Sequence, residues 1–264
     1  MIDFTAFPAL SYSASSVASQ CCTEYVLCTA QGWDLLLRAY WEEFSKADDV
    51  CLVLRTFPKH KNDANFDPEA SGEWVHMKLR GAAHTWFTKD PDEMACVHVL
   101  ATHISERDLP RLYKAANAFV LPSRGEGWGR PMVEAMSMGM PTVITDWGAP
   151  TDYANSSNAW PIPAAGLSCV NSEPKRGNPA GVYAAHRWAE ASIPELRRTL
   201  RMLFTNTDPR IAQRAAAARA TMRGYGYEEI NRICESRLEL CATLHEPLRK
   251  YQLLLSSQLI ALPA

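Results

Sequence analysis

The sequence of 264 residues lacks several features that would place it in a common functional class. It has no run of about 20 apolar residues, the length that a membrane-spanning helix requires. No segment gathers Lys and Arg, and the formal net charge of −2 disfavours binding to a nucleic-acid backbone. No positive charge precedes an apolar block near the N-terminus, so a secretory signal is not expected.

The cysteines and histidines lack the spacing of metal ligands. There is no CxxC pair among the eight cysteines, and no metal site is expected. Several cysteines lie in apolar runs, as Cys51 does, and a free thiol in such a run packs as a small hydrophobic group. We therefore expect reduced, buried thiols and a cytoplasmic location.

Two catalytic motifs are also absent. Ser123 does not stand in G-x-S-x-G, which excludes the nucleophile elbow of an α/β-hydrolase. No G-x-G-x-x-G follows the first expected strand, so a dehydrogenase that binds NAD is disfavoured.

The sequence does contain short apolar runs that alternate with amphipathic stretches. This order predicts an α/β fold with a parallel sheet flanked by helices. A helical region follows from about Ser192, where Ser192 and Glu195 form a capping box. The expected strands are Tyr25–Cys28, Val50–Arg55, Val97–Thr102, Ala118–Leu121 and Pro141–Thr145.

The segment of residues 121–134, LPSRGEGWGRPMVE, contains most of the candidate residues for binding a ligand. It follows an expected strand and runs into a helix opened by Pro131, and ligands bind at this edge of an open α/β sheet. Its glycines allow close approach of a ligand, and the helix N-terminus suits a diphosphate. Glu126 and Glu134 can accept hydrogen bonds from hydroxyl groups, and Arg55 and Arg124 stand at strand ends as candidate partners for negative charge. From spacing alone, a tight turn with no ligand remains an equal alternative.

The stretch PSRGEGWGRPMVEAMSMGMPTVITDWGAP resembles the signature of retaining GT-B glycosyltransferases of family 4, the "glycosyl transferases group 1" domain. Seven residues separate its two glutamates, as in the family's E-x7-E motif. The similarity extends upstream through GWDLLLRAYWEEF and VCLVLRT and downstream to HRWAEAS, from about Gly32 to Phe204.

The resemblance implies a Rossmann-like, donor-binding half of a GT-B fold over residues 25–205. We expect a disordered leader at residues 1–24 and a helical extension at 206–264. It also implies transfer of a sugar from a nucleotide-diphosphate donor with retained configuration, without a metal or another cofactor. Glu126 would contact the donor sugar as the catalytic residue, and Glu134 would bind the ribose. The donor-binding residues implied are Arg55, Arg124, Gly125, Gly127, Trp128, Gly129, Arg130 and Glu134.

Two departures from the family pattern leave three hypotheses open. We expect the acceptor-binding domain to be missing, as in a fragment or a truncated gene model, since about 31 residues precede the match. Gln31 stands where relatives carry a Lys that contacts the diphosphate, and the loss of such a charge-assisted contact is worth roughly 1.5–3 kcal/mol. The chain is accordingly a glycosyltransferase, a non-catalytic module that binds nucleotide sugars, or a subunit that completes a GT-B cleft with a partner chain in trans.

Overall fold

The computed structural model describes residues 15–20, 29–56, 68–101, 104–170, 186–241 and 243. The chain divides into two compact units, residues 1–220 and 221–264. In the described part, no helix is both long enough and apolar enough to cross a membrane.

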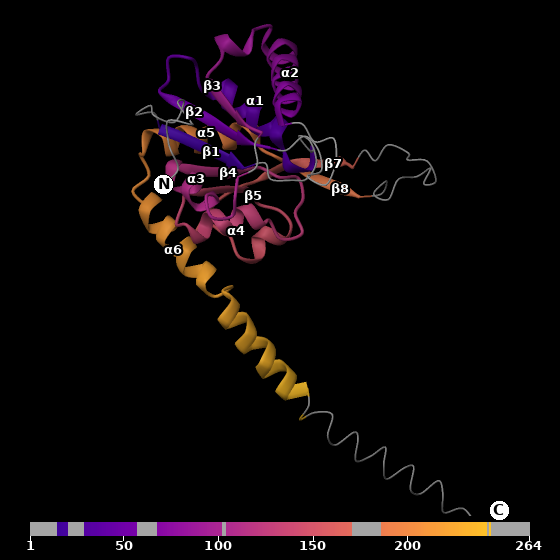
Figure 1. Ribbon diagram of the computed structural model, residues 1–264, viewed down its shortest axis with the longest axis vertical. Helices are drawn as coiled ribbons and strands as arrows, with labels where there is room; N and C mark the ends of the chain where they lie inside the picture. Colours follow the sequence, from indigo (N-terminus) through magenta and orange to yellow (C-terminus); the bar gives the residue numbers. More distant parts are fainter. Residues whose placement is uncertain are drawn as a thin grey trace, which may run out of the picture. The chain divides into compact units, whose positions relative to one another are not determined.

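The first unit is built on a sheet of six parallel strands in the order β3-β2-β1-β4-β5-β6 (Figure 1). This is the strand order of a doubly wound, Rossmann-like fold, in which the direction of winding reverses between β1 and β4. The α/β fold with a parallel sheet, expected from the sequence, is confirmed. The strands are β1 (Ser15–Gln20), β2 (Val50–Arg55), β3 (Cys96–Leu100), β4 (Ala118–Leu121), β5 (Thr142–Thr145) and β6 (Trp160–Ile162).

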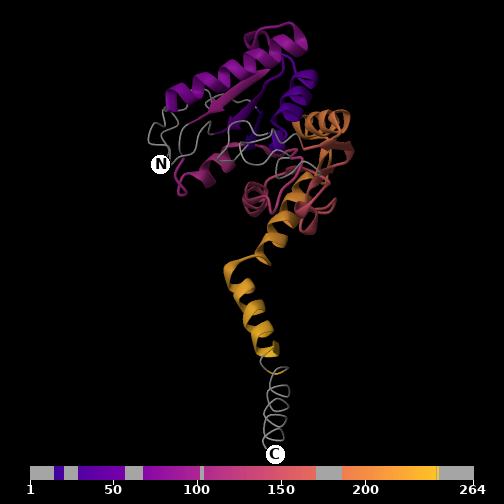
Figure 2. The same cartoon turned by 90° about the vertical axis from the view of Figure 1, so that its right-hand side faces the viewer.

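Strands β2, β4 and β5 are fully buried, which is why β2 and β4 are short runs of mostly apolar residues and β5 holds Val143 and Ile144 between two threonines. Helices from separate parts of the chain cover the sheet. The apolar face of α1 joins residues of α2 and α5 in one core cluster, α4 packs on β4 and β5, and α2 lies beside β3 (Figures 1 and 2). The helices of this unit are α1 (Trp33–Glu43), α2 (Pro68–Phe87), α3 (Leu109–Ala115), α4 (Arg130–Ser137), α5 (Ile193–Thr205) and α6 (Ile211–Arg223), the last of which continues into the second unit.

Strand β1 lies within residues 1–24, where the sequence predicted a disordered leader; residues 1–14 and 21–24 lie outside the described residues. It pairs with β2 from Ser15 to Gln20 and with β4 through Val17 and Ala18, so it stands in the middle of the sheet. Its sequence, SSVASQ, contains mostly small and polar residues and therefore gives no apolar signal of a buried strand. The strand expected at Tyr25–Cys28 lies outside the described residues.

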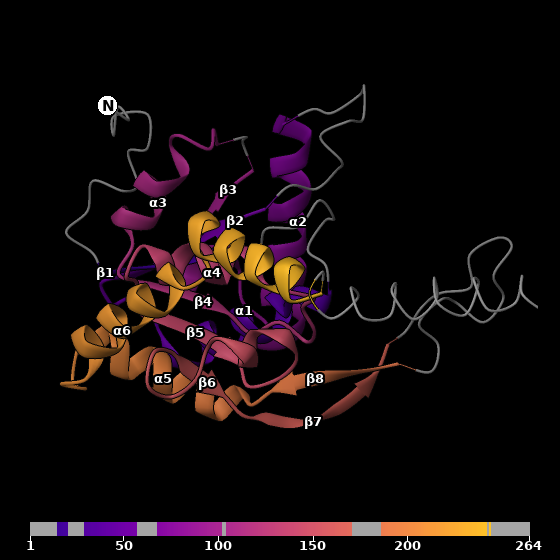
Figure 3. The ribbon, with the colours of Figure 1, turned by 90° about the horizontal axis from the view of Figure 1, so that it is seen from below.

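A second sheet, which the sequence did not predict, is the antiparallel pair of β7 (Ala164–Cys169) and β8 (Arg187–Ala191). The two strands lie side by side and project from the body of the parallel sheet (Figure 3). Strand β8 falls in the HRWAEAS stretch, and the backbone N–H of Ala189 donates to the carbonyl of Arg124 in the loop after β4. This pair of strands therefore contacts the loop after β4, which holds most of the candidate ligand-binding residues.

The second unit begins at Thr221, whereas the sequence predicted a helical extension from residue 206. The difference arises because most of α6 belongs to the first unit: the Arg214 guanidinium lies 5.0 Å from the centre of the Trp160 ring and donates to the carbonyl of Ala159. In the second unit, residues 227–241 are helical. The helix expected from Pro247 lies outside the described residues.

Candidate functional site

The loop between β4 and α4 lies at the carboxyl edge of the sheet, where the winding reverses. Gly129 is the residue before α4 and adopts a left-handed conformation with φ +79°. A Cβ at this position would stand 2.7 Å from the Met132 sulfur, so both the backbone angle and the space require glycine. The loop therefore enters α4 in one fixed conformation and places Glu134 in the second turn of the helix.

Glu134 is held from both sides on α4. Its carboxylate accepts a hydrogen bond of 2.9 Å from the Tyr113 hydroxyl, and an Arg130 guanidinium nitrogen lies 3.8 Å from its other oxygen. The Glu134 side chain is one-third exposed. A carboxylate that is oriented by a neighbour and still open to solvent can accept further hydrogen bonds from a ligand.

Glu126 occupies the loop itself and is half-buried. Burial raises the pKa of its carboxyl group, and the hydrogen bond from Gln31 partly offsets that rise. The Gln31 amide nitrogen lies 2.8 Å from Glu126 Oε1. The carboxylate thus meets a neutral donor, with no cation of the described part bonded to it.

Gln31 itself was not expected to touch this loop. It ends the short 3-10 turn η3 (Thr29–Gln31) and is only 5% exposed. Gly32, at φ +67°, follows it, and a Cβ on Gly32 would stand 2.0 Å from the Pro122 carbonyl oxygen. The Arg124 backbone N–H also donates to the Ala30 carbonyl at 2.7 Å. The turn before α1 and the loop after β4 are therefore pressed together, backbone against backbone.

The Gln31 carbonyl oxygen Oε1 is buried and has no hydrogen-bond partner among the described residues. Leaving such an acceptor unpaired typically costs about 1–3 kcal/mol.

The guanidinium of Arg124 is held by carboxylates of the protein. Its two terminal nitrogens each donate to one oxygen of Asp34 at 2.7 Å, and its Nε donates to Glu190 at 2.8 Å. Burial alone would lower the pKa of Arg124, but the hydrogen bonds and charges of these two acids raise it. Arg124 therefore ties the loop to α1 and β8, a role that the sequence did not predict.

The remaining predicted residues differ in their surroundings. A Cβ placed on Gly125 would lie 3.6 Å from the Trp188 ring, and among the described residues a Cβ placed on Gly127 would meet nothing within 4 Å. Trp128 is 39% exposed, and its ring centre lies 5.0 Å from that of Tyr153. The Tyr153 hydroxyl donates to the Trp128 carbonyl at 2.6 Å and so fixes the loop backbone. The structure thus gathers Glu126, the glycines, Trp128, Arg130 and Glu134 on one loop and helix start.

Arg55 is buried and stands at the carboxyl end of β2, opposite Leu100 of β3. That position is on the same edge of the sheet as the loop after β4, although β1 lies between the two strands. In the described part, no three His, Cys, Asp or Glu side chains come together to hold a metal ion.

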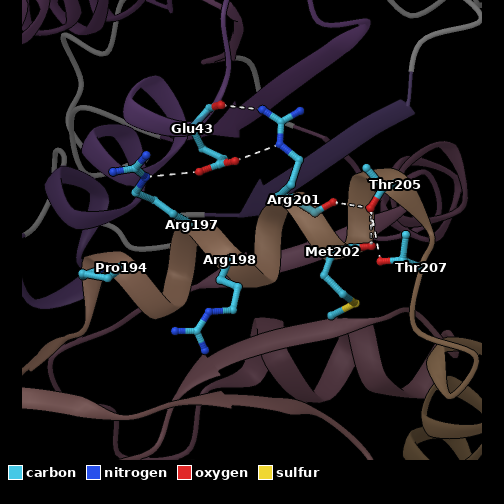
Figure 4. Close-up of a pocket in the computed structure, with 8 residues that line it drawn as sticks. All are labelled: Glu43, Pro194, Arg197, Arg198, Arg201, Met202, Thr205 and Thr207. Atoms are coloured by element: carbon cyan, nitrogen blue, oxygen red, sulfur yellow. Dashed lines mark hydrogen bonds and ion pairs between the residues drawn. The ribbon is translucent and has the colours of Figure 1, made fainter.

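A hollow of about 490 Å³ lies elsewhere, between α5 and the end of α1 (Figure 4). Arg197 and Arg201 of α5 point across it to Glu43, which lies 3.2 Å and 2.8 Å from them. It shares no lining residue with the loop after β4. Because acids of α1 match these cations, the hollow is a seam of ion pairs rather than a site for an anion.

Two cysteines contradict the expectation of reduced thiols. Cys51 of β2 and Cys96 of β3 are direct partners in the sheet register, with Cα atoms 4.6 Å apart, and form a disulfide. The expectation failed because the pairing depends on strand register, which cysteine spacing does not reveal. The disulfide also removes one basis for expecting a cytoplasmic location.

Comparison with known proteins adds a family match. The profile of the family described as Glycosyl transferases group 1 matches residues 31–166. Mannosylfructose-phosphate synthase from Agrobacterium fabrum is 48% identical over 46 residues, which are 17% of this chain and 10% of that protein. O-antigen chain mannosyltransferase B from Escherichia coli is 50% identical over 44 residues, 17% of this chain and 12% of that protein.

Among solved structures, Anabaena HepE in complex with UDP-glucose has a similar fold, with a TM-score of 0.59 and 15% sequence identity. The match covers 89% of this chain and 51% of HepE, so the chain spans about half the length of that structure.

Proposed function

The chain belongs to the glycosyl transferases group 1 family, and from this premise we propose that its first unit binds a nucleotide-diphosphate sugar at the loop after β4. The proposed reaction is transfer of the sugar with retention of configuration, as in family 4 of the GT-B enzymes, without a metal ion. The observation that carries the proposal is the placement of Glu126 and Glu134 on one loop and helix start at the point where the winding of the sheet reverses.

Each carboxylate has its own role in this proposal. Glu134, oriented by Tyr113 and open to solvent, accepts hydrogen bonds from the ribose hydroxyls. Glu126, in the loop, accepts hydrogen bonds from the hydroxyls of the donor sugar. It is the proposed catalytic residue, because it lies beside the sugar that is transferred. One donor molecule then spans the distance from the loop to the second turn of α4.

The diphosphate lies between these two ends. Gly127, Trp128 and Gly129 bring the backbone close to it, and the N-terminus of α4 supplies a positive dipole. As the bond to the sugar breaks, negative charge grows on the diphosphate, and preorganised dipoles of this kind stabilise it. Arg130 and Arg55 are the proposed cationic contacts, and Arg124 acts by holding the loop.

The acceptor side of the cleft belongs to a second domain in this proposal, either in the same protein or in a partner chain. The chain spans about half the length of HepE, which was solved with UDP-glucose. A cleft with one wall leaves the donor open to water and does not orient an attacking hydroxyl. A module that binds nucleotide sugars without turnover is therefore the alternative, and the neutral Gln31 at the loop favours it.

Calorimetric titration of the chain with nucleoside diphosphates and nucleotide sugars tests the proposal. UDP, GDP and ADP, together with UDP-glucose and GDP-mannose, cover the common bases. Saturable binding that Glu134→Ala weakens is the expected result, and an assay for released nucleoside diphosphate separates enzyme from binding module. A folded chain that binds none of these probes would refute a donor site here.

A further inference from the structure

Gln31 and Glu126 meet across the reversal point of the sheet. Gln31 lies on the connection from β1 to α1, and Glu126 lies on the connection from β4 to α4. These two strands are neighbours at the point where the winding changes direction. The hydrogen bond of 2.8 Å between the two side chains therefore joins the two connections that flank the reversal point, beside the loop proposed to bind the donor.

The position of the Gln31 amide is set by the backbone. The close approach of Gly32 to Pro122 and the hydrogen bond from Arg124 N–H to Ala30 fix the turn on both sides of Gln31. The side chain is 5% exposed and uses only its amino group, which it donates to Glu126. Its buried carbonyl oxygen is unpaired among the described residues, so an apolar side chain of similar length would remove that unpaired acceptor and, of the printed hydrogen bonds of the Gln31 side chain, would remove the one to Glu126.

The same arrangement gives this amide a partner within the protein. One N–H of its amino group is directed at Glu126, and its carbonyl oxygen is an acceptor that phosphate oxygens cannot pair with. Glu126 Oε2, in contrast, accepts no hydrogen bond in the described part of the chain and belongs to a half-buried residue. That oxygen is the one available to a sugar hydroxyl.

We propose that Gln31 is a positioning residue: it holds Glu126 Oε1 so that the other carboxylate oxygen faces the donor sugar. This inference rests on the proposed function and deepens it. Position 31 then governs preference for the sugar of the donor, while affinity for the nucleoside diphosphate does not depend on it.

A double-mutant cycle with UDP and UDP-glucose as probes tests the inference on the full chain. The variants are Gln31→Met, Glu126→Gln and both together, and Gln213→Met, on an exposed part of α6, is the matched control. We expect Gln31→Met to weaken UDP-glucose binding about tenfold, the effect of losing one charge-assisted hydrogen bond, with UDP binding unchanged. The double variant should bind no more weakly than Glu126→Gln alone, because Gln31 acts through Glu126.

The pH titration of the Glu126 carboxyl carbon, observed by NMR, gives a readout that a purely structural role of Gln31 would not change. The hydrogen bond from Gln31 lowers the pKa of Glu126 against the effect of burial. In Gln31→Met, Glu126 should therefore titrate at a higher pH, while the melting temperature stays near that of the unmodified chain. Glu126→Gln assigns the signal.

The outcomes separate the two proposals. Equal weakening of UDP and UDP-glucose by Gln31→Met would show contact with the diphosphate and overturn the inference, as would additive losses in the double variant. An unchanged preference for UDP-glucose would also overturn it while leaving the donor site intact. Failure of the unmodified chain to bind either probe would refute the proposed function and this inference with it.

Discussion

Removal of the Arg124 guanidinium should destabilise the fold. Its side chain is 7% exposed and is bonded to Asp34 and Glu190, whose side chains are 26% and 29% exposed. Breaking a buried ion pair by removing one partner costs about 3–5 kcal/mol. Because both acids keep some contact with water, we expect Arg124→Met to lower the free energy of unfolding by about 2–4 kcal/mol.

Urea unfolding, monitored by tryptophan fluorescence, measures this change. Arg198→Met is the matched control, since Arg198 is 72% exposed and, among the described residues, forms its ion pair with Glu195 in its own helix. Such surface pairs contribute about 0–1 kcal/mol. A loss below about 1 kcal/mol for Arg124→Met, comparable to the control, would show that the network contributes no net stability. A loss of UDP affinity at unchanged stability would instead assign Arg124 to the donor.

The loss of stability caused by Arg124→Met should depend on pH because of Glu190. Burial would raise the pKa of Glu190, but its hydrogen bonds from Arg124 and Ser168 lower it in the folded state. A depressed pKa contributes stability that is present above the unfolded value, about 4.3, and is lost as the pH falls through the folded value. The difference between the unmodified chain and Arg124→Met should therefore be full at pH 7 and shrink below about pH 4. An unchanged difference at pH 3 would contradict this origin.

Three further perturbations test the site and the sheet. Glu134→Ala should weaken UDP binding by about 10- to 150-fold in calorimetry, the effect of losing a charge-assisted hydrogen bond to ribose, and an unchanged affinity would remove Glu134 from the site. Gly129→Ala should lower stability by about 1–3 kcal/mol because of its positive φ and the close Met132 sulfur. Gly127→Ala, where a Cβ meets open space, is its control and should unfold at nearly the same urea concentration. Replacing both Cys51 and Cys96 by Ala opens a crosslink over a sequence separation of 45 and should cost up to about 4 kcal/mol, and an unchanged unfolding midpoint would argue against the crosslink.

The sequence predicted the parallel sheet wherever local composition reflects burial. Ala118–Leu121 was expected as a strand with the bounds that β4 has, and Val50–Arg55 with those of β2. Both are buried along their whole length, and both are apolar except for Arg55 at the end of β2. Strand β1 is held by backbone pairing with β2 and β4 and is rich in serine and alanine, so its place in the sheet is not visible in composition.

Contacts between distant residues explain what the sequence could not show about the site. The loop, its glycines and the two glutamates were predicted from one continuous motif. The partners of Arg124, in contrast, are separated from it by 90 and 66 residues, and Gln31 is separated from Glu126 by 95. From the sequence, Gln31 was interpreted as a lost contact to the diphosphate, because a residue type alone does not tell which group its side chain meets.

The observed contacts of Gln31 and Arg124 change which groups can stabilise the charge of a bound diphosphate. Gln31 brings no charge to the site, and the charge of Arg124 is matched by Asp34 and Glu190. Two positions that could have supplied cations to a diphosphate therefore fix the loop that carries Glu126. In the proposed site, the diphosphate then depends on the backbone and dipole at the start of α4 and on Arg55 and Arg130, of which Arg130 is largely exposed and screened by salt. Selectivity among donors should consequently reside in the sugar hydroxyls whose hydrogen bonds Glu126 accepts, because the ribose that Glu134 would bind is common to these donors.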